Sequence, residues 1–211
     1  IVIVSELLHR AWVQYSSDSY SGTTSLDQLS TTLAECTDEV PGSEFGEDVL
    51  VGDFNNDSLA DLVISAPGCV NNEGRVFIWY GAAAGLASSP DVTIPGGEFL
   101  GGSLALGDLN GDSIDDLFVQ ERLAPGENDP NREDRGNLWV FFGDAGGLSA
   151  TPNFKLIGGF SDRRFGASVA VLSDISSPAD GLPDLAVSAP EAAYDGVGQG
   201  AVYIFEGLSE W

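Results

Sequence analysis

Two segments of this chain carry the same set of oxygen-bearing side chains at the same spacing. Asp, Asn, Asp and Asp occupy positions 1, 3, 5 and 9 of the segment 53–61, and the same residue types fill those positions in 108–116. Alternate residues of a tight loop can point toward one centre, where the backbone carbonyl at position 7 adds a further oxygen. Calcium takes about six to eight hard oxygen ligands in a flexible shell, so both segments are predicted to bind calcium. The predicted ligands are Asp53, Asn55, Asp57, Leu59 and Asp61 in the first loop and Asp108, Asn110, Asp112, Ile114 and Asp116 in the second.

A third segment, 174–184, has a related but altered pattern. Serine replaces asparagine at position 3, and two extra residues, one of them Pro178, precede the acid at position 5. Because a serine hydroxyl is a weaker ligand than an amide or carboxylate oxygen, we expect a third site of lower affinity. The sequence therefore predicts two to three calcium ions per chain. The predicted ligands of the third loop are Asp174, Ser176, Asp180, Leu182 and Asp184.

Other metals and other loop types fit this pattern less well. An EF-hand loop needs a glutamate at its twelfth position and flanking helices, and neither is indicated here. Magnesium demands a stricter octahedral geometry than such a loop provides. Zinc and copper prefer His or Cys ligands, which the loops lack. An acidic β-turn explains any single loop equally well, because Asp and Asn favour turns. Recurrence at one place of a repeat favours metal binding. Clustered aspartates repel each other without a cation, so calcium is expected to contribute to folding.

The elements that position these loops recur along the chain. Short runs of Val, Ile, Leu and aromatic residues alternate with Gly, Pro, Asn and Asp, which is typical of strands and turns. Each unit has about four such runs in about 60 residues, the geometry of a propeller blade. We therefore predict an all-β fold, a β-propeller of four-stranded antiparallel blades. The acidic insert 121–135 accounts for the wider spacing between the second and third loops.

The predicted blades at the two ends are incomplete. The chain divides into a partial blade over 1–43, two full blades over 44–98 and 99–160, and an incomplete blade over 161–211. This division predicts sheets of three, four, four and three strands, about three and a half blades. Because a blade cannot bury both of its faces alone, we expect a homodimer, or the remainder of a longer chain, to complete the propeller.

Short motifs on either side of the predicted metal loops resemble the FG-GAP repeats of integrin α-subunit propellers. The motifs are Phe45-Gly46 with Ser65-Ala66-Pro67, and Phe165-Gly166 with Ser188-Ala189-Pro190. The second copy departs from this pattern, with Leu100-Gly101 and Gln120-Glu121-Arg122 at the corresponding places. The resemblance implies calcium in the loop that joins strands 1 and 2 of each blade. It also implies a ligand-binding face at the opposite end, where the segments 68–73, 121–135 and 191–199 would lie.

Composition limits the partners. The chain has 33 acidic and 8 basic residues, a formal net charge of −25, which disfavours nucleic acid and anionic membrane surfaces. No apolar run approaches the roughly 20 residues that cross a bilayer, so membrane insertion is not expected. Cys36 and Cys69 permit one disulfide, with two free buried thiols as the alternative.

The interpretation that combines these features is an extracellular or cell-surface adhesion module that is not an enzyme. Calcium loops suit extracellular calcium levels, and the opposite face would bind a protein or a glycan. One alternative is a polysaccharide-active enzyme domain, but the single histidine, His9, lies in the partial blade, and the acids have calcium spacing. The other is a purely structural spacer. Trp12, Trp79 and Trp139 occupy third-strand positions, so we expect them in core or inter-blade packing.

Overall fold

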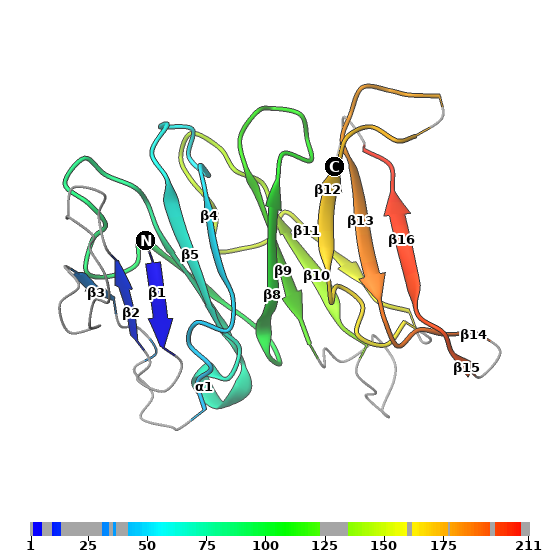
Figure 1. Ribbon diagram of the computed structural model, residues 1–211, viewed down its shortest axis with the longest axis horizontal. Coiled ribbons are helices and arrows are strands. Elements are labelled where there is room, and N and C mark those ends of the chain that lie inside the picture. Colours follow the sequence, from blue (N-terminus) through cyan, green and yellow to red (C-terminus); the bar gives the residue numbers. More distant parts are fainter. Residues whose placement is uncertain are drawn as a thin grey trace, which may run out of the picture.

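A computed structural model, shown in Figure 1, describes residues 2–5, 10–13, 31–33, 36, 42–122, 135–159, 162–176, 178–194 and 197–207. These residues form four antiparallel sheets in succession and one small ribbon. The first sheet contains β1 (Val2–Ser5), β2 (Arg10–Val13) and β3 (Thr31–Leu33). The second contains β4 (Val49–Gly52), β5 (Asp61–Ala66), β6 (Arg75–Trp79) and β7 (Val92–Pro95). The third contains β8 (Leu100–Gly107), β9 (Asp116–Glu121), β10 (Asn137–Phe141) and β11 (Phe154–Ile157). The fourth contains β12 (Val169–Leu172), β13 (Asp184–Ala189) and β16 (Ala201–Phe205), and the ribbon pairs β14 (Ala193–Tyr194) with β15 (Val197–Gly198).

The predicted all-β propeller fold is confirmed, with sheets of three, four, four and three strands. Within each sheet the strands are hydrogen-bonded in chain order, as expected when short turns join antiparallel neighbours. The sheets stand side by side from β1–β3 to β12–β16 (Figure 1). Strand β8 contacts both β4 and β12, so the first strands of consecutive sheets are neighbours. The described sheets form an open array of blades rather than a closed ring.

Facing sheets bury the strands between them on both sides. Every residue of β5 and β9 is buried, which explains why the middle of each strand, residues 62–64 and 117–119, is an unbroken apolar run. Alternate side chains of β5 point to opposite sheets, since Val63 packs in the cluster shared with the third sheet while Leu62 and Ile64 pack on the other face. The side chains between the second and third sheets include Phe54, Val76, Ile78, Ile94, Leu117, Val119, Trp139 and Phe141. The buried positions of Trp79 and Trp139 confirm the packing role predicted for them; the side chain of Trp12 lies outside the described residues.

The repeated motifs hold the second and fourth sheets to the turns that precede them. Gly46 has a φ of 95°, which glycine adopts easily, and its N–H donates to the carbonyl of Ser65 at 2.7 Å. The Ser65 hydroxyl accepts from the N–H of Asp48 at 3.0 Å. In the departing second copy, Leu100 is still fully buried and Gly101 keeps a positive φ of 97°. The apolar and conformational roles of the motif therefore survive its change of sequence.

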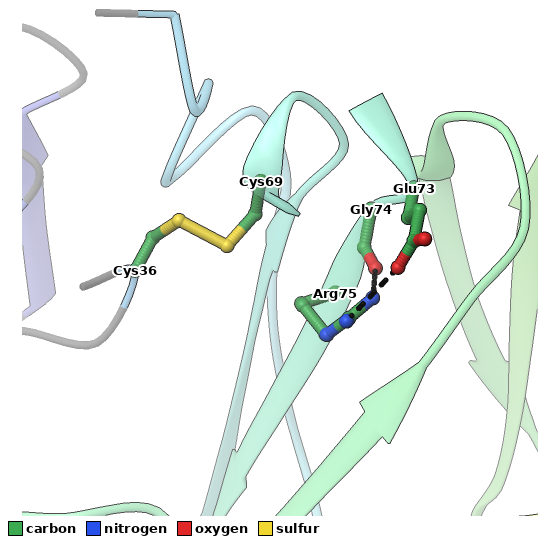
Figure 2. The surroundings of a disulfide bond; sticks show 5 residues. All are labelled: Cys36, Cys69, Glu73, Gly74 and Arg75. Carbon is green, nitrogen blue, oxygen red and sulfur yellow. Dashed lines mark hydrogen bonds and ion pairs between the residues drawn. A yellow bond between two sulfur atoms is a disulfide. The ribbon is translucent and has the colours of Figure 1, made fainter. Parts of the chain in front are cut away.

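A disulfide connects the second sheet to the chain that precedes it. Cys36 and Cys69 are bonded, with their Cα atoms 6.0 Å apart, so the structure contains the disulfide rather than two free thiols. Cys69 opens the short helical turn α1 (Cys69–Asn72) that leads into β6 (Figure 2). Beside it, Arg75 donates to the carbonyl of Gly74 at 2.6 Å and pairs with Glu73 at 3.2 Å. No helix in the described part of the chain has the length and apolar character to span a bilayer.

Candidate metal centre

All three predicted loops join the first strand of a sheet to its second strand. They connect β4 to β5, β8 to β9 and β12 to β13, and they lie at the same end of the array (upper end in Figure 1). Sheets with the same strand order place equivalent connections at the same end, so the repeat brings the three acidic loops onto one face.

The aspartate at position 9 of each loop is fully buried and ties the loop to the end of the third strand. In the first loop, Asp61 accepts the N–H of Phe54, at position 2, on one oxygen at 2.8 Å and that of Gly81 on the other, also at 2.8 Å. The same pair of bonds recurs in the other two loops. They run from Leu109 (2.8 Å) and Gly143 (3.0 Å) to Asp116, and from Ile175 (2.7 Å) and Gly207 (3.0 Å) to Asp184.

The glycine that donates to this aspartate is required by the close approach of the loop. A Cβ at Gly143 would lie 2.4 Å from the carbonyl oxygen of Asp115, and one at Gly207 would lie 2.2 Å from that of Pro183. At Gly81 the corresponding distance, to the oxygen of Ala60, would be 2.7 Å. These anchors were not predicted from the sequence, although a glycine follows the third strand in every copy.

The aspartate at position 1 holds the sharp turn of the loop. Asp53 accepts from the N–H of Ser58 at 2.9 Å, and Ser58 has a φ of 65°. The second loop repeats this with Asp108 and Ser113 (2.8 Å), and the third with Asp174 and Gly181 (2.6 Å), both donors having positive φ. An EF-hand loop places glycine at this sixth position for the same turn. Gly181 at position 6 puts Asp180 at position 5 and Asp184 at position 9 of the third loop.

The side chains at positions 3 and 5 bring further oxygen atoms into each loop. In the first loop, Asn55 donates its amide to Asp57 at 3.0 Å, and Asp57 accepts from the N–H of Leu59 at 2.8 Å. The second loop has the same two bonds, at 3.0 Å and 2.9 Å, among Asn110, Asp112 and Ile114. In the third, Ser176 instead turns its hydroxyl to Asp174 at 2.9 Å. The first two loops are thus alike, and the third differs where its sequence differs.

Burial and like charges act on the carboxylates at position 9. Burial, with the charges of Asp112 and Asp108 adding to it, raises the pKa of Asp116 to about 6. Burial likewise raises the pKa of Asp61, with smaller contributions from Asp57 and Asp53. In the third loop, hydrogen bonds from the Gly181 N–H and the Ser176 hydroxyl lower the pKa of Asp174. A divalent cation would offset the repulsion in the first two loops.

The donor set of these loops fits calcium. In the described residues no three His, Cys, Asp or Glu side chains form a ready-made metal cluster, so the acids alone do not make a site. Carboxylates are instead mixed with an amide or hydroxyl oxygen and a backbone carbonyl, all hard donors. Each carboxylate oxygen has two lone pairs, and an oxygen that accepts one N–H can still bind an ion. These residues would hold a calcium ion, which would supply the missing positive charge.

The opposite end of the array is described only in part. Of the predicted ligand-binding segments, 68–73 forms the disulfide-bonded turn α1, and 191–199 contains the ribbon β14–β15. Residues 123–134 of the insert lie outside the described residues. At the base of that insert the carboxylate of Glu121 is buried and accepts from Asn137 and Trp139, each at 2.9 Å. Glu121 stands where the other two copies have Ala66 and Ala189, and its buried polar contacts were not predicted from the sequence.

Comparisons with known proteins agree with the repeat. Residues 45–79 match the family model of the FG-GAP repeat. Integrin alpha-V of Gallus gallus is 32% identical over 213 residues, covering 97% of this chain and 19% of the integrin. Integrin alpha-PS2 of Drosophila melanogaster is 34% identical over 78% of this chain and 12% of its own length. Phosphatidylinositol-glycan-specific phospholipase D of Mus musculus is 36% identical over 48% of this chain and 13% of its own length. The chain therefore spans less than a fifth of the length of each of these relatives.

Proposed function

We propose that this chain, an integrin-α-like array of FG-GAP repeats, is a calcium-stabilised ligand-binding module of an extracellular or cell-surface protein. The observation that carries the proposal is the recurrence of one hydrogen-bond frame in three loops at one end of the array. Each frame surrounds hard oxygen donors of the kind that calcium prefers. The similarity to integrin α-subunits supports a role in adhesion or ligand binding.

Calcium is proposed to have a mainly structural role. The aspartate at position 9 links each loop to the glycine just beyond the third strand, so an ion bound at the loop would brace two strand connections together. Two to three ions per chain would stiffen one end of the sheets. The loops at the other end would then be presented to a protein or glycan on a rigid scaffold.

An oxidising location outside the cytosol is supported by the disulfide. Disulfides persist in secreted and cell-surface proteins and are rare in the cytosol, and Cys36 and Cys69 are bonded here. Extracellular calcium would also fill sites that cytosolic calcium leaves empty.

The face of the fourth sheet that no described sheet covers is proposed to bind a further blade. Val202 and Ile204 of β16 are 67% and 49% exposed, although their equivalents in β6, Val76 and Ile78, are fully buried against the next sheet. Ile175 is 55% exposed, while the residues at the same loop position, Phe54 and Leu109, are fully buried. We infer that a blade from a second copy, or from the remainder of a longer chain, covers this face.

Catalysis is not part of the proposal. One relative, phosphatidylinositol-glycan-specific phospholipase D, is named for an enzymatic activity. The matched region covers only 13% of that relative, so the similarity concerns a small part of it. The acids with a raised pKa described here, Asp61 and Asp116, belong to the loops and are tied to backbone N–H groups.

Calcium titration by calorimetry tests the proposal. We expect the unaltered chain to bind two to three ions, and Asp57→Ala and Asp112→Ala each to remove one of them. Asp144→Asn, an exposed acid outside the loops, serves as the matched control and should keep every site. Chelation is expected to lower the melting temperature by many degrees, because bound calcium stabilises only the folded state. An unchanged titration of both loop variants, or an unchanged melt in excess chelator, would exclude the metal role.

A further inference from the structure

One residue of the second loop contacts the first loop directly. Asp115 stands at position 8, between the predicted ligands Ile114 and Asp116. Its carboxylate accepts from the N–H of Asp53 at 2.9 Å, and its own N–H donates to the carbonyl of Asp53 at 3.2 Å. Both backbone polar groups of the residue that opens the first loop are therefore held by one residue of the second.

The packing leaves room for this contact. A Cβ at Gly52, the residue before Asp53, would lie 2.9 Å from the Asp115 carboxylate and 3.0 Å from the ring of Phe54. Any side chain at position 52 would therefore push Asp115 away from the first loop. On its other side, the carbonyl of Asp115 lies against Gly143, which donates to Asp116 at 3.0 Å. An unbroken line of contacts thus runs from Asp53 through Asp115 to the buried anchor of the second loop.

No equivalent contact can form between the second and third loops. The residue at the corresponding place in the third loop is Pro183, which has neither a carboxylate nor an N–H to donate. In the first loop the corresponding residue is Ala60. Asp115 is therefore a feature of one pair of loops and not of the repeat, and the chain itself supplies a pair for comparison.

We propose that Asp115 is a positioning residue that couples calcium binding in the first loop to calcium binding in the second. The inference rests on the proposed calcium function of both loops. An ion in the second loop would hold Ile114 and Asp116, and with them the intervening Asp115. Asp115 would in turn fix the backbone of Asp53, whose carboxylate is the first ligand of the neighbouring loop. Ordering that has taken place in one loop need not be repeated in the other, so the coupling is positive and reciprocal.

The coupling is measured in a variant in which only the first and second loops can bind calcium. In an Asp180→Ala background, calorimetry gives the calcium affinity of the intact pair, and Asp57→Ala or Asp112→Ala leaves one loop at a time. We expect each single loop to bind at least about five-fold more weakly than the same loop beside an occupied neighbour. Asp115→Ala should abolish this difference. If each loop binds calcium alone as tightly as it does beside an occupied neighbour, or more tightly, the coupling is overturned.

The second and third loops form the matched control. With the first loop disabled by Asp57→Ala, their affinities should be independent of each other within about two-fold, whether or not Asp115 is present. A merely structural role of Asp115 would change the melting temperature and all affinities together, without changing the difference between paired and single loops. The same cooperativity in this control pair would show that Asp115 does not carry the coupling.

Two further variants keep the test decisive if Asp115→Ala fails to fold. Gly52→Ala displaces the carboxylate and should remove the coupling, whereas Asp115→Asn keeps an acceptor oxygen and the N–H and should retain it. Loss of coupling in Asp115→Asn with retention in Gly52→Ala would contradict the hydrogen-bond route. If the unaltered chain binds no calcium, the proposed function itself fails. If it binds calcium in independent loops, that function stands and only the coupling is refuted.

Discussion

The aspartate at position 9 combines two tasks in one side chain. In each loop both of its oxygens accept backbone N–H groups, one from inside the loop and one from the end of the third strand. It is also a predicted calcium ligand. A carboxylate suits both tasks because it accepts only, and its two oxygens offer about four lone pairs. An amide of the same shape does not, since its nitrogen donates.

Replacing one of these aspartates should destabilise the chain even without metal. In Asp116→Asn the amide nitrogen would face the N–H of Leu109 or of Gly143, leaving that buried donor unsatisfied. We expect a loss of about 1–3 kcal/mol in the free energy of unfolding, measured with urea in chelator at pH 7. Asp112→Asn, at an exposed position of the same loop, should change it by less than about 0.5 kcal/mol. Equal stabilities for the two variants would show that the buried bonds contribute nothing.

At the scale of elements, backbone contact between the third strand and the metal loop determines the local sequence. Gly143, which follows β10, lies where the metal loop comes closest to the end of that strand. The space at this point excludes even a methyl group. The turn that follows it is open by comparison. A Cβ at Gly146 would meet only the exposed side chain of Asp144, at 3.0 Å.

These two glycines make a paired test of loop anchoring. Gly143→Ala should lower the free energy of unfolding by about 1–3 kcal/mol, because the carbonyl of Asp115 must move away from the new methyl group. It should also weaken calcium binding in the second loop. Gly146→Ala should alter neither quantity appreciably. Urea unfolding and calorimetry of the two variants measure the difference, and a fully stable Gly143→Ala variant would refute the close approach.

The disulfide joins Cys36, which follows β3, to the helical turn α1 between β5 and β6. Cys36 and Cys69 are 33 residues apart in sequence. The double variant Cys36→Ala, Cys69→Ala should lose about 2–4 kcal/mol of unfolding free energy, mainly through greater freedom of the unfolded chain. Reductant should lower the free energy of unfolding of the unaltered chain by a similar amount and leave that of the double variant unchanged. A double variant that still responds to reductant would contradict this assignment.

At the scale of the whole molecule, association with a further blade depends on the uncovered face of the fourth sheet. Its apolar residues correspond to residues that are buried between sheets elsewhere in the chain. Exposed apolar strands at the edge of a sheet favour association, and the formal net charge of −25 opposes it. If calcium binds as proposed, it would reduce this negative charge, and together with the apolar area that becomes buried it would favour the association of two copies.

Mass in solution tests association through this face. With calcium and at micromolar concentration we expect the mass of a dimer, measured by light scattering. The pair Val202→Asp and Ile204→Asp should yield a monomer, while Val51→Asp, at an exposed residue of β4, should leave the mass unchanged. A monomeric unaltered chain would exclude a second copy as the covering blade and leave the remainder of a longer chain.

The sequence allowed the sheets and the loops between first and second strands to be predicted, because both depend on local patterns that recur. Phe45-Gly46 and the spacing of Asp53, Asn55 and Asp57 are examples. Contacts between copies were not predictable. The hydrogen bonds of Asp115 to Asp53 join residues 62 positions apart and depend on how two sheets are staggered. The buried carboxylate of Glu121 was also missed, because its partners lie on the neighbouring strand β10 of the same sheet, on the far side of the insert in the sequence.

The tryptophans of the two middle blades provide intrinsic optical probes. The indole N–H of Trp139 donates to a carboxylate, and the ammonium of Lys155 lies 3.4 Å from its ring centroid. The indole N–H of Trp79, in the preceding blade, has no acceptor among the described residues. Rings in such different surroundings should differ in emission wavelength. With the other tryptophans replaced by phenylalanine, fluorescence during denaturation would reveal whether adjacent blades melt together or one after the other.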